Sequence, residues 1–197
     1  ARYADLSDRV VDQARRRVFD GEKVPATEKV VSIFEPHADI IIKDKREVLY
    51  GHKLLLAPGA SGLVQYCSVL EGNPADSTLV GPALVGVTEA TGRVPRQAAL
   101  DGGFASIENL ALAKGMGVED VCFSKRRGME IADMAKSTWV YRKLWRFRVG
   151  IEAGISWLKR SFGLGACPWK GEDGFDAYVQ SAVIAFNLLV LGRLTAT

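Results

Sequence analysis

The sequence predicts an α/β (α+β) protein with a mixed sheet flanked by helices. Short apolar runs bounded by Gly, Pro and Asp alternate with longer segments whose apolar residues recur every three or four positions. The expected order is strand, strand, helix, strand, helix, strand, helix, helix. Hydrophobic residues make up 48% and charged residues 25% of the 197 residues, a balance typical of a globular domain that excludes a disordered or fibrous chain.

The first half of the chain is expected to hold one helix and a hairpin. Apolar residues at helical spacing predict a helix over residues 3–18. A short apolar run predicts a strand over residues 29–34, and the mixed residues 37–47 indicate a loop or an edge segment. Two further runs flank a Pro-Gly turn, which predicts a hairpin of residues 50–57 and 63–70.

The second half is expected to alternate short strands with helices. Asn73, followed by Pro74 and an acid, predicts a helix start, and this helix continues to about residue 90. A buried strand over residues 97–100 ends at Asp101. The remaining predicted elements are a helix over residues 107–114 capped by Ser106, a strand over residues 121–123, and helices over residues 137–162 and 175–194.

The charge of the chain is unevenly distributed. The net charge is +3, but residues 125–160 contain ten Lys and Arg against three Asp and Glu. The rest of the chain carries a net charge of −4. This basic segment indicates an anionic partner, with nucleic acid as the first candidate, and the alternative is a solvated helix face.

The cysteines and histidines argue against several classes of site. Cys67, Cys122 and Cys167 are far apart and form no CxxC pair, so neither a disulfide framework nor a cysteine zinc site is expected. They are interpreted as plain buried thiols, and reduced thiols fit a cytoplasmic protein. His52 is interpreted as an ordinary strand residue. The apolar residues 182–194 are too few to span a bilayer, so no membrane partner is expected.

Asp101 is the first candidate site residue. It ends a predicted strand directly before two glycines, and ligands and metals collect at the carboxyl ends of strands in α/β sheets. The alternative interpretation is a simple Asp-Gly-Gly turn.

The predicted helix over residues 137–162 holds the second group of candidates. One arc of about 60° carries an acid between two basic and two aromatic residues, namely Tyr141, Trp145, Arg148, Glu152 and Lys159. An adjacent face carries further cations, including Arg142, Arg146 and Arg160. The alternative is an ordinary ion pair between Arg148 and Glu152. Glycine weakens a helix interior, so Gly150 and Gly154 need another explanation. They indicate that another part packs closely against the helix at these positions.

The spacing Trp145-x2-Arg148-x3-Glu152-x6-Lys159 resembles the Tyr-Arg-Glu-Lys signature of DDE transposases from bacterial insertion sequences, with Trp145 in place of the usual Tyr. Asp101 resembles the second acid of that family. Shorter stretches also resemble it, at residues 50–53, 72–76 and 162–164. The resemblance covers residues 30–194.

The resemblance implies a ribonuclease H-like catalytic core whose first strand carries a further Asp. No convincing strand pattern with a suitable Asp precedes residue 50. We therefore expect that the first strand and its acid lie upstream of Ala1, and that the 197-residue chain alone is inactive. Residues 1–28 are predicted to form an N-terminal helical segment, and residues 29–197 a partial ribonuclease H-like core.

The resemblance also implies metal-dependent DNA cleavage and strand transfer. Asp101 and Glu152 would be catalytic and would bind Mg²⁺ or Mn²⁺, which prefer carboxylate oxygens. The implied DNA contacts are Trp145, Arg148, Lys159, Arg142, Arg146 and Arg160, with further backbone affinity from Lys125, Arg126 and Arg127. The expected partners are transposon ends and target DNA, with a homodimer in the DNA complex. The expected location is the cytoplasm, in association with the nucleoid.

Two alternatives remain open. One is a DNA-binding remnant of a transposase that does not cut. The other is a metal-dependent nuclease of the same fold that acts on another substrate, because a fold alone does not set the function.

Overall fold

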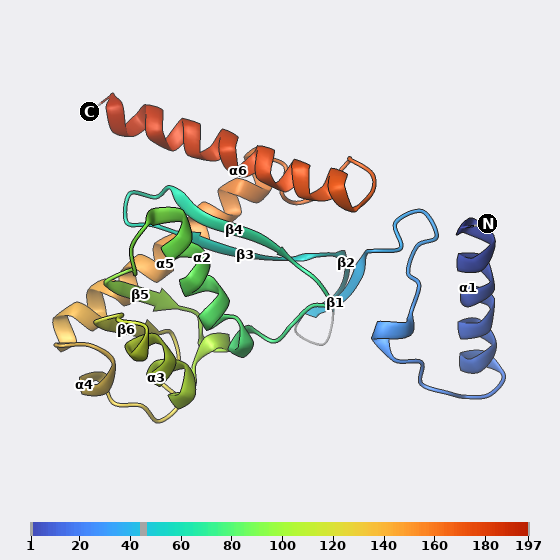
Figure 1. Cartoon of the computed structure of the whole chain (residues 1–197), viewed down its shortest axis with the longest axis horizontal. Coiled ribbons are helices and arrows are strands. Elements are labelled where there is room, and N and C mark those ends of the chain that lie inside the picture. The colour runs from blue at the N-terminus through green and yellow to red at the C-terminus, as the bar shows by residue number, and fades with distance from the viewer. Residues whose placement is uncertain (1, 44–46, 197) are drawn as a thin grey trace. The chain divides into compact units, whose positions relative to one another are not determined.

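The computed structural model describes residues 2–43 and 47–196 (Figure 1). The chain divides into two compact units. The first unit comprises Ala1–Lys53, Val69–Asn73 and Pro168–Tyr178. The second comprises Leu54–Ser68, Pro74–Cys167 and Val179–Thr197. The chain therefore passes between the units several times. The predicted division after residue 28 stays a prediction.

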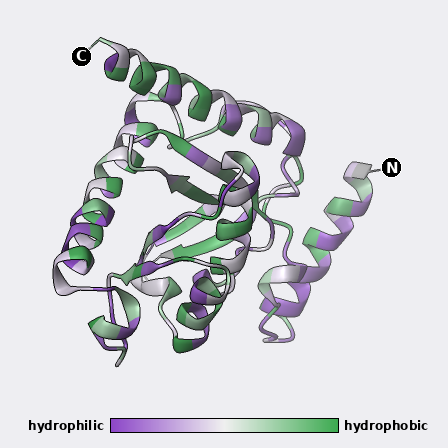
Figure 2. Cartoon of the chain, turned by 60° about the vertical axis from the view of Figure 1, so that its left-hand side comes forward, coloured by the Kyte–Doolittle hydropathy of each residue, from purple (hydrophilic) through white to green (hydrophobic). Residues whose placement is uncertain are grey.

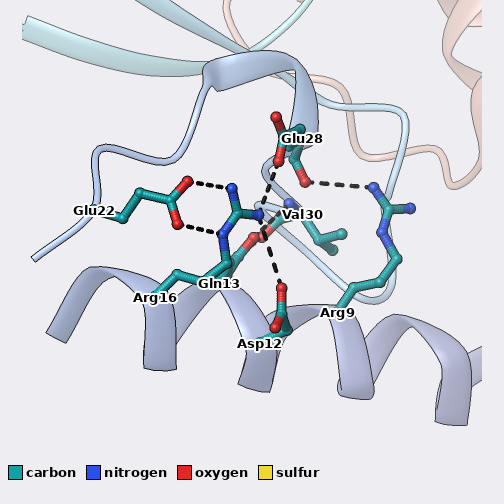
Figure 3. Close-up of polar contacts among 7 residues, drawn as sticks. All are labelled: Arg9, Asp12, Gln13, Arg16, Glu22, Glu28 and Val30. Carbon is teal, nitrogen blue, oxygen red and sulfur yellow. Dashed lines mark hydrogen bonds and ion pairs between the residues drawn. The ribbon is translucent and has the colours of Figure 1, made fainter. Parts of the chain in front are cut away.

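The first unit begins with helix α1 (Arg2–Val18), which confirms the helix predicted over residues 3–18. The following loop is tied to this helix by side chains (Figure 3). Gln13 donates from Nε2 to the carbonyl oxygen of Val30 and accepts from the Val30 amide at Oε1, each at 3.0 Å. Arg16 pairs with Glu22 and with Glu28, which ends a 3-10 turn over Ala26–Glu28.

These contacts explain why the strand predicted over residues 29–34 is wrong, since this segment is irregular. The side chain of Gln13 takes both backbone groups of Val30 that a neighbouring strand would otherwise bond. Val30 is also buried, so its apolar character serves packing rather than a sheet.

Strands β1 (Asp39–Lys43) and β2 (Glu47–Gly51) form an antiparallel pair, with Asp39 opposite Gly51 and Lys43 opposite Glu47. The chain then changes partner, because β3 (Lys53–Pro58) pairs with β4 (Val64–Leu70). The single strand predicted over residues 50–57 is therefore two strands separated by His52. The interpretation that no strand with an Asp precedes residue 50 is also wrong, because β1 begins with Asp39.

The second unit is built around the parallel pair β5 (Gln97–Leu100) and β6 (Asp120–Phe123), in which Leu100 lies opposite Phe123. Helices α2 (Val80–Thr91) and α3 (Ile107–Gly115) contact each other, and α3 and α5 (Thr138–Ser161) contact β6. Fully buried side chains fill the core between these elements, including Val80, Val118, Val121 and Phe123. Met134 of the short helix α4 (Ile131–Met134) belongs to the same core.

A smaller core joins β4, the C-terminal half of α5 and helix α6 (Glu172–Thr195). Trp157, Phe162 and Phe186 meet edge to face, with ring centroids 5.4–5.6 Å apart. Asn187 accepts from the Val64 amide at 2.8 Å and donates to its carbonyl oxygen at 2.9 Å. The amide side chain thereby satisfies backbone groups of β4 as a neighbouring strand would.

Helix α6 is largely apolar, whereas the end of α1 is hydrophilic (Figure 2). With 24 residues and a mean hydropathy of 1.5 in its most apolar window, α6 is long and apolar enough to cross a membrane. The length argument made for residues 182–194 therefore does not apply to the whole helix. Val179, Ala182, Val183 and Phe186 are buried in the second unit, but only 22% of the apolar window of α6 is buried.

The predicted elements of the second unit are largely confirmed, and the predicted start at Asn73 is wrong. Asn73 has a positive φ of 49°, a 3-10 turn follows at Asp76–Thr78, and α2 begins only at Val80. The mixture of helices and strands confirms the α/β class. The described strands pair two by two and do not form the one mixed sheet that was predicted. The ribonuclease H-like sheet therefore stays a prediction. Among the thiols, Cys122 is buried, whereas Cys67 and Cys167 are half-buried.

Candidate active site

Asp101 lies directly after β5, at the N-terminal end of the 3-10 turn Gly102–Phe104. Its Oδ1 accepts from the Gly102 amide at 2.7 Å and from Ser124 Oγ at 2.8 Å. Ser124 follows β6 as Asp101 follows β5, so the two side chains lie at the carboxyl ends of two parallel strands. Asp101 is therefore held in place by the turn and by the neighbouring strand, while its side chain stays 66% exposed.

The surroundings favour the ionised form of Asp101. Partial burial by itself would raise the pKa of this carboxyl. The hydrogen bonds from Ser124 and Gly102 and the charges of Arg148 and Lys125 outweigh that effect and hold the pKa below its ordinary value. The carboxylate of Asp101 is therefore negatively charged at neutral pH and attracts cations.

Helix α5 presents the second group of candidates. Ser137 caps it by accepting from the Val140 amide at 3.2 Å. One turn later the buried Tyr141 donates from its hydroxyl to the carbonyl oxygen of Phe123 at 2.8 Å, which fixes the helix against β6. Leu144 is buried on the same side. This docking determines where the following residues of α5 meet the end of β5.

Arg148 brings the two predicted acids together. Its Nη1 lies 3.2 Å from Asp101 Oδ1, and its Nη2 lies 3.1 Å from Glu152 Oε1. The side chain of Arg148 is only 16% exposed, whereas that of Glu152 is 66% exposed. The alternative of a simple ion pair within the helix accounts for one of these contacts but not for the contact with Asp101.

The other predicted residues lie on the exposed sides of α5. Trp145 is 44% exposed and lines a shallow open depression of about 350 Å³ together with Tyr141, Arg142 and Arg146. Lys159 and Arg160 are exposed further along the helix. Tyr141 belongs to the core and Arg148 is only 16% exposed, so the exposed members of the predicted seam are Trp145, Glu152 and Lys159.

Gly150 and Gly154 do not show the close packing that the sequence indicated. A methyl group added at either position would meet no atom of the described residues within 4 Å, apart from the helix itself and the chain neighbours. Gly102 is tighter, because an added Cβ would lie 2.9 Å from the Cγ of Lys125. Lys125 therefore packs over the turn that follows Asp101.

Ser124 is a site residue that the sequence analysis missed. The signal was present, because Ser124 follows its strand as Asp101 follows the neighbouring one, and parallel strands end at the same edge. Spacing alone did not show which polar residue would face Asp101.

A polar cluster in the first unit was also missed. His37 Nδ1 lies 2.7 Å from His52 Nε2, and the two rings stack at 5.0 Å. His37 Nε2 contacts Glu35 at 2.8 Å, and His52 Nδ1 lies 3.4 Å from Asp39. Asp39 also accepts from the Gly72 amide at 3.0 Å. His52 is thus a buried member of a network, not the plain strand residue that was expected.

The described residues contain no group of three or more His, Cys, Asp or Glu side chains placed to hold a metal ion. Asp101 and Glu152 nevertheless have the donor chemistry that Mg²⁺ and Mn²⁺ prefer. Both already contact one cation, the guanidinium of Arg148. The pair therefore supplies oxygen donors of the type that a divalent metal shell requires.

Comparison with known proteins agrees with the sequence resemblance. A family model described as a transposase DDE domain matches residues 13–188, which is most of the chain. Searches of curated proteins and of solved structures found no match.

Proposed function

Because this chain belongs to the family of transposase DDE domains, we propose that it takes part in metal-dependent DNA strand cleavage and strand transfer. The observation that carries the proposal is the meeting of Asp101 and Glu152 at one guanidinium. These acids come from a strand end and from a separate helix. A purely structural helix would not need the contact with Asp101.

We assign Asp101 and Glu152 as ligands of a divalent cation, Mg²⁺ or Mn²⁺. When bound, such an ion supplies positive charge that activates the attacking oxygen and stabilises the leaving one. Asp101 is suited to this role because Gly102 and Ser124 hold its carboxylate in the ionised form. Glu152 is exposed and can adjust its position to an incoming cation. A third acidic ligand remains part of the proposal.

The DNA would lie along the exposed sides of α5. The flat indole of Trp145, flanked by Arg142 and Arg146, suits an unpaired base with phosphates on either side. Lys159 and Arg160 extend this basic surface toward the end of the helix. Such contacts give affinity that falls with salt. A homodimer in the DNA complex belongs to the same proposal, and sedimentation of the DNA-bound protein measures it.

The test is DNA nicking and strand transfer by the protein expressed from its whole reading frame, with Mg²⁺ or Mn²⁺. Asp101→Asn and Glu152→Gln should each lower the rate by about a hundredfold or more, because metal charge is worth several kcal/mol in the transition state. Glu119→Gln is the matched control, since Glu119 pairs with Arg96 on the surface. Undiminished cleavage by Asp101→Asn and Glu152→Gln would refute the proposal.

A DNA-binding protein that does not cut is the second candidate. It is favoured by one observation, that two acids and not three gather among the residues that the structure describes. It predicts salt-dependent DNA binding with no nicking in either metal.

A further inference from the structure

Arg148 occupies an unusual position between the two acids. Its guanidinium reaches Asp101 with one terminal nitrogen and Glu152 with the other. Its Nε is buried and has no hydrogen-bond partner among the described residues. The two terminal nitrogens therefore contact the carboxylates, while the buried Nε–H donor remains without a hydrogen bond.

A cation in this place opposes a second cation. The guanidinium neutralises part of the charge with which Asp101 and Glu152 would attract a divalent ion, and it repels that ion directly. It also occupies the oxygens Oδ1 of Asp101 and Oε1 of Glu152. A metal ion that binds these two oxygens therefore competes with both contacts of Arg148.

We propose that Arg148 is a displaceable internal cation, which bridges Asp101 and Glu152 in the metal-free protein and is released toward DNA phosphate when a divalent metal binds. The inference rests on the proposed function, because it takes these two acids as metal ligands. It adds an order of events to that function: metal loading frees the arginine, and the freed arginine adds to DNA affinity.

The contacts of the two acids support this release. Asp101 keeps its hydrogen bonds from Gly102 and Ser124 when Arg148 leaves, so its orientation does not depend on the arginine. Glu152 is exposed, and Arg148 is its ion-pair partner among the described residues. Trp145, three residues before Arg148 on the helix, is exposed on the side where DNA is proposed to lie. A guanidinium released from the acids therefore has DNA phosphate within its range and can satisfy its Nε there.

Release by metal makes metal and DNA binding cooperative. If Ca²⁺ or Mn²⁺ raises DNA affinity through Arg148, DNA must raise metal affinity by the same factor. The coupling should disappear when residue 148 carries no charge. An arginine with only a structural role would stabilise the fold but would not couple metal affinity to DNA affinity.

The first experiment measures Mn²⁺ binding to the DNA-free protein by electron paramagnetic resonance of the free ion. We expect Arg148→Gln to bind Mn²⁺ on the order of tenfold more tightly than the original protein, and Arg148→Lys to fall between them. Arg146→Gln is the matched control, because it removes the same charge from an exposed position on the same helix. Thermal unfolding of each variant reports whether it is folded.

The outcomes separate the inference from the proposed function. Unchanged or weaker Mn²⁺ binding by folded Arg148→Gln, together with weaker binding by Asp101→Asn, overturns the inference and leaves the function standing. Mn²⁺ binding that neither Asp101→Asn nor Glu152→Gln weakens overturns the metal assignment itself. Tighter binding by Arg148→Gln and by Arg146→Gln alike overturns the inference, since bulk charge would then explain the gain.

The second experiment measures DNA affinity by fluorescence anisotropy with and without Ca²⁺. The original protein should bind DNA several-fold more tightly with Ca²⁺, and Arg148→Gln should lose most of this gain. An equal gain in both proteins would show that the metal raises DNA affinity without Arg148 and would refute the coupling.

Discussion

Replacing Asp120 by Ala should remove a large part of the stability of the second unit. Asp120 begins β6 and its side chain is fully buried. Its Oδ1 accepts from the Lys136 amide at 2.8 Å, and its Oδ2 accepts from Gln97 Nε2 at 2.9 Å. A buried hydrogen bond to a charged group is worth about 1.5–3 kcal/mol. The substitution also leaves both donors unsatisfied, so the expected loss is about 3–5 kcal/mol.

Urea and thermal unfolding of the chain measure this loss. For a chain of this size, about 1 kcal/mol corresponds to about 2–4 °C, so Tm should fall by about 6–20 °C. Glu119→Ala is the matched control, because the neighbouring Glu119 forms only an exposed ion pair with Arg96 and should change the free energy of unfolding by less than about 1 kcal/mol. A loss below about 1 kcal/mol for Asp120→Ala would refute the reasoning.

The pH dependence of unfolding provides a second check on Asp120. Burial raises the pKa of this carboxyl, but the hydrogen bonds from Lys136 and Gln97 and nearby lysine charges outweigh it and lower the pKa. A lowered pKa in the folded state means that the contribution is complete above the unfolded value of about 3.9 and is lost as the pH falls through the folded value. The difference in stability between the original protein and Asp120→Ala should therefore shrink below about pH 4.

Three further substitutions test other contacts. Tyr141→Phe removes the hydrogen bond to the Phe123 carbonyl and should cost about 1–2 kcal/mol in urea unfolding; no change would mean that this bond does not fix α5. Gly86→Ala would place a Cβ against the Tyr66 ring, closer than van der Waals contact, and should destabilise by about 1–3 kcal/mol despite the better helix propensity of Ala; a stabilised variant would contradict the tight contact. Arg146→Ala should lower the slope of log DNA affinity against log salt by about 1, and an unchanged slope in the anisotropy titration would exclude a phosphate contact there.

Local patterns predicted the elements whose signals lie within a few residues. The strand over residues 97–100 and the cap Ser106 are confirmed. Capping and apolar periodicity depend on neighbours along the chain, so they can be read without the fold. The strand predicted over residues 29–34 failed because Gln13, distant in sequence, takes the backbone groups of Val30.

In the candidate site, too, some contacts follow from local spacing and others depend on tertiary packing. The helical spacing of Arg148 and Glu152 predicted their ion pair, which the structure contains. The contact between Arg148 and Asp101 depends on how α5 docks on β6, through Tyr141 and the carbonyl oxygen of Phe123. Ser124 joins the site only because the two parallel strands end side by side.

The sequence by itself determined the family of this protein, the α/β class and the helix that carries Arg148 and Glu152, because motif spacing and periodicity are local properties of the chain. Only the tertiary structure decided that Arg148 bridges two acids and that His52 joins a buried network with His37. It also decided that the strand before His52 pairs with β1 and the strand after it with β4. These contacts join residues far apart in sequence, and their geometry follows from packing and strand pairing that no local pattern encodes.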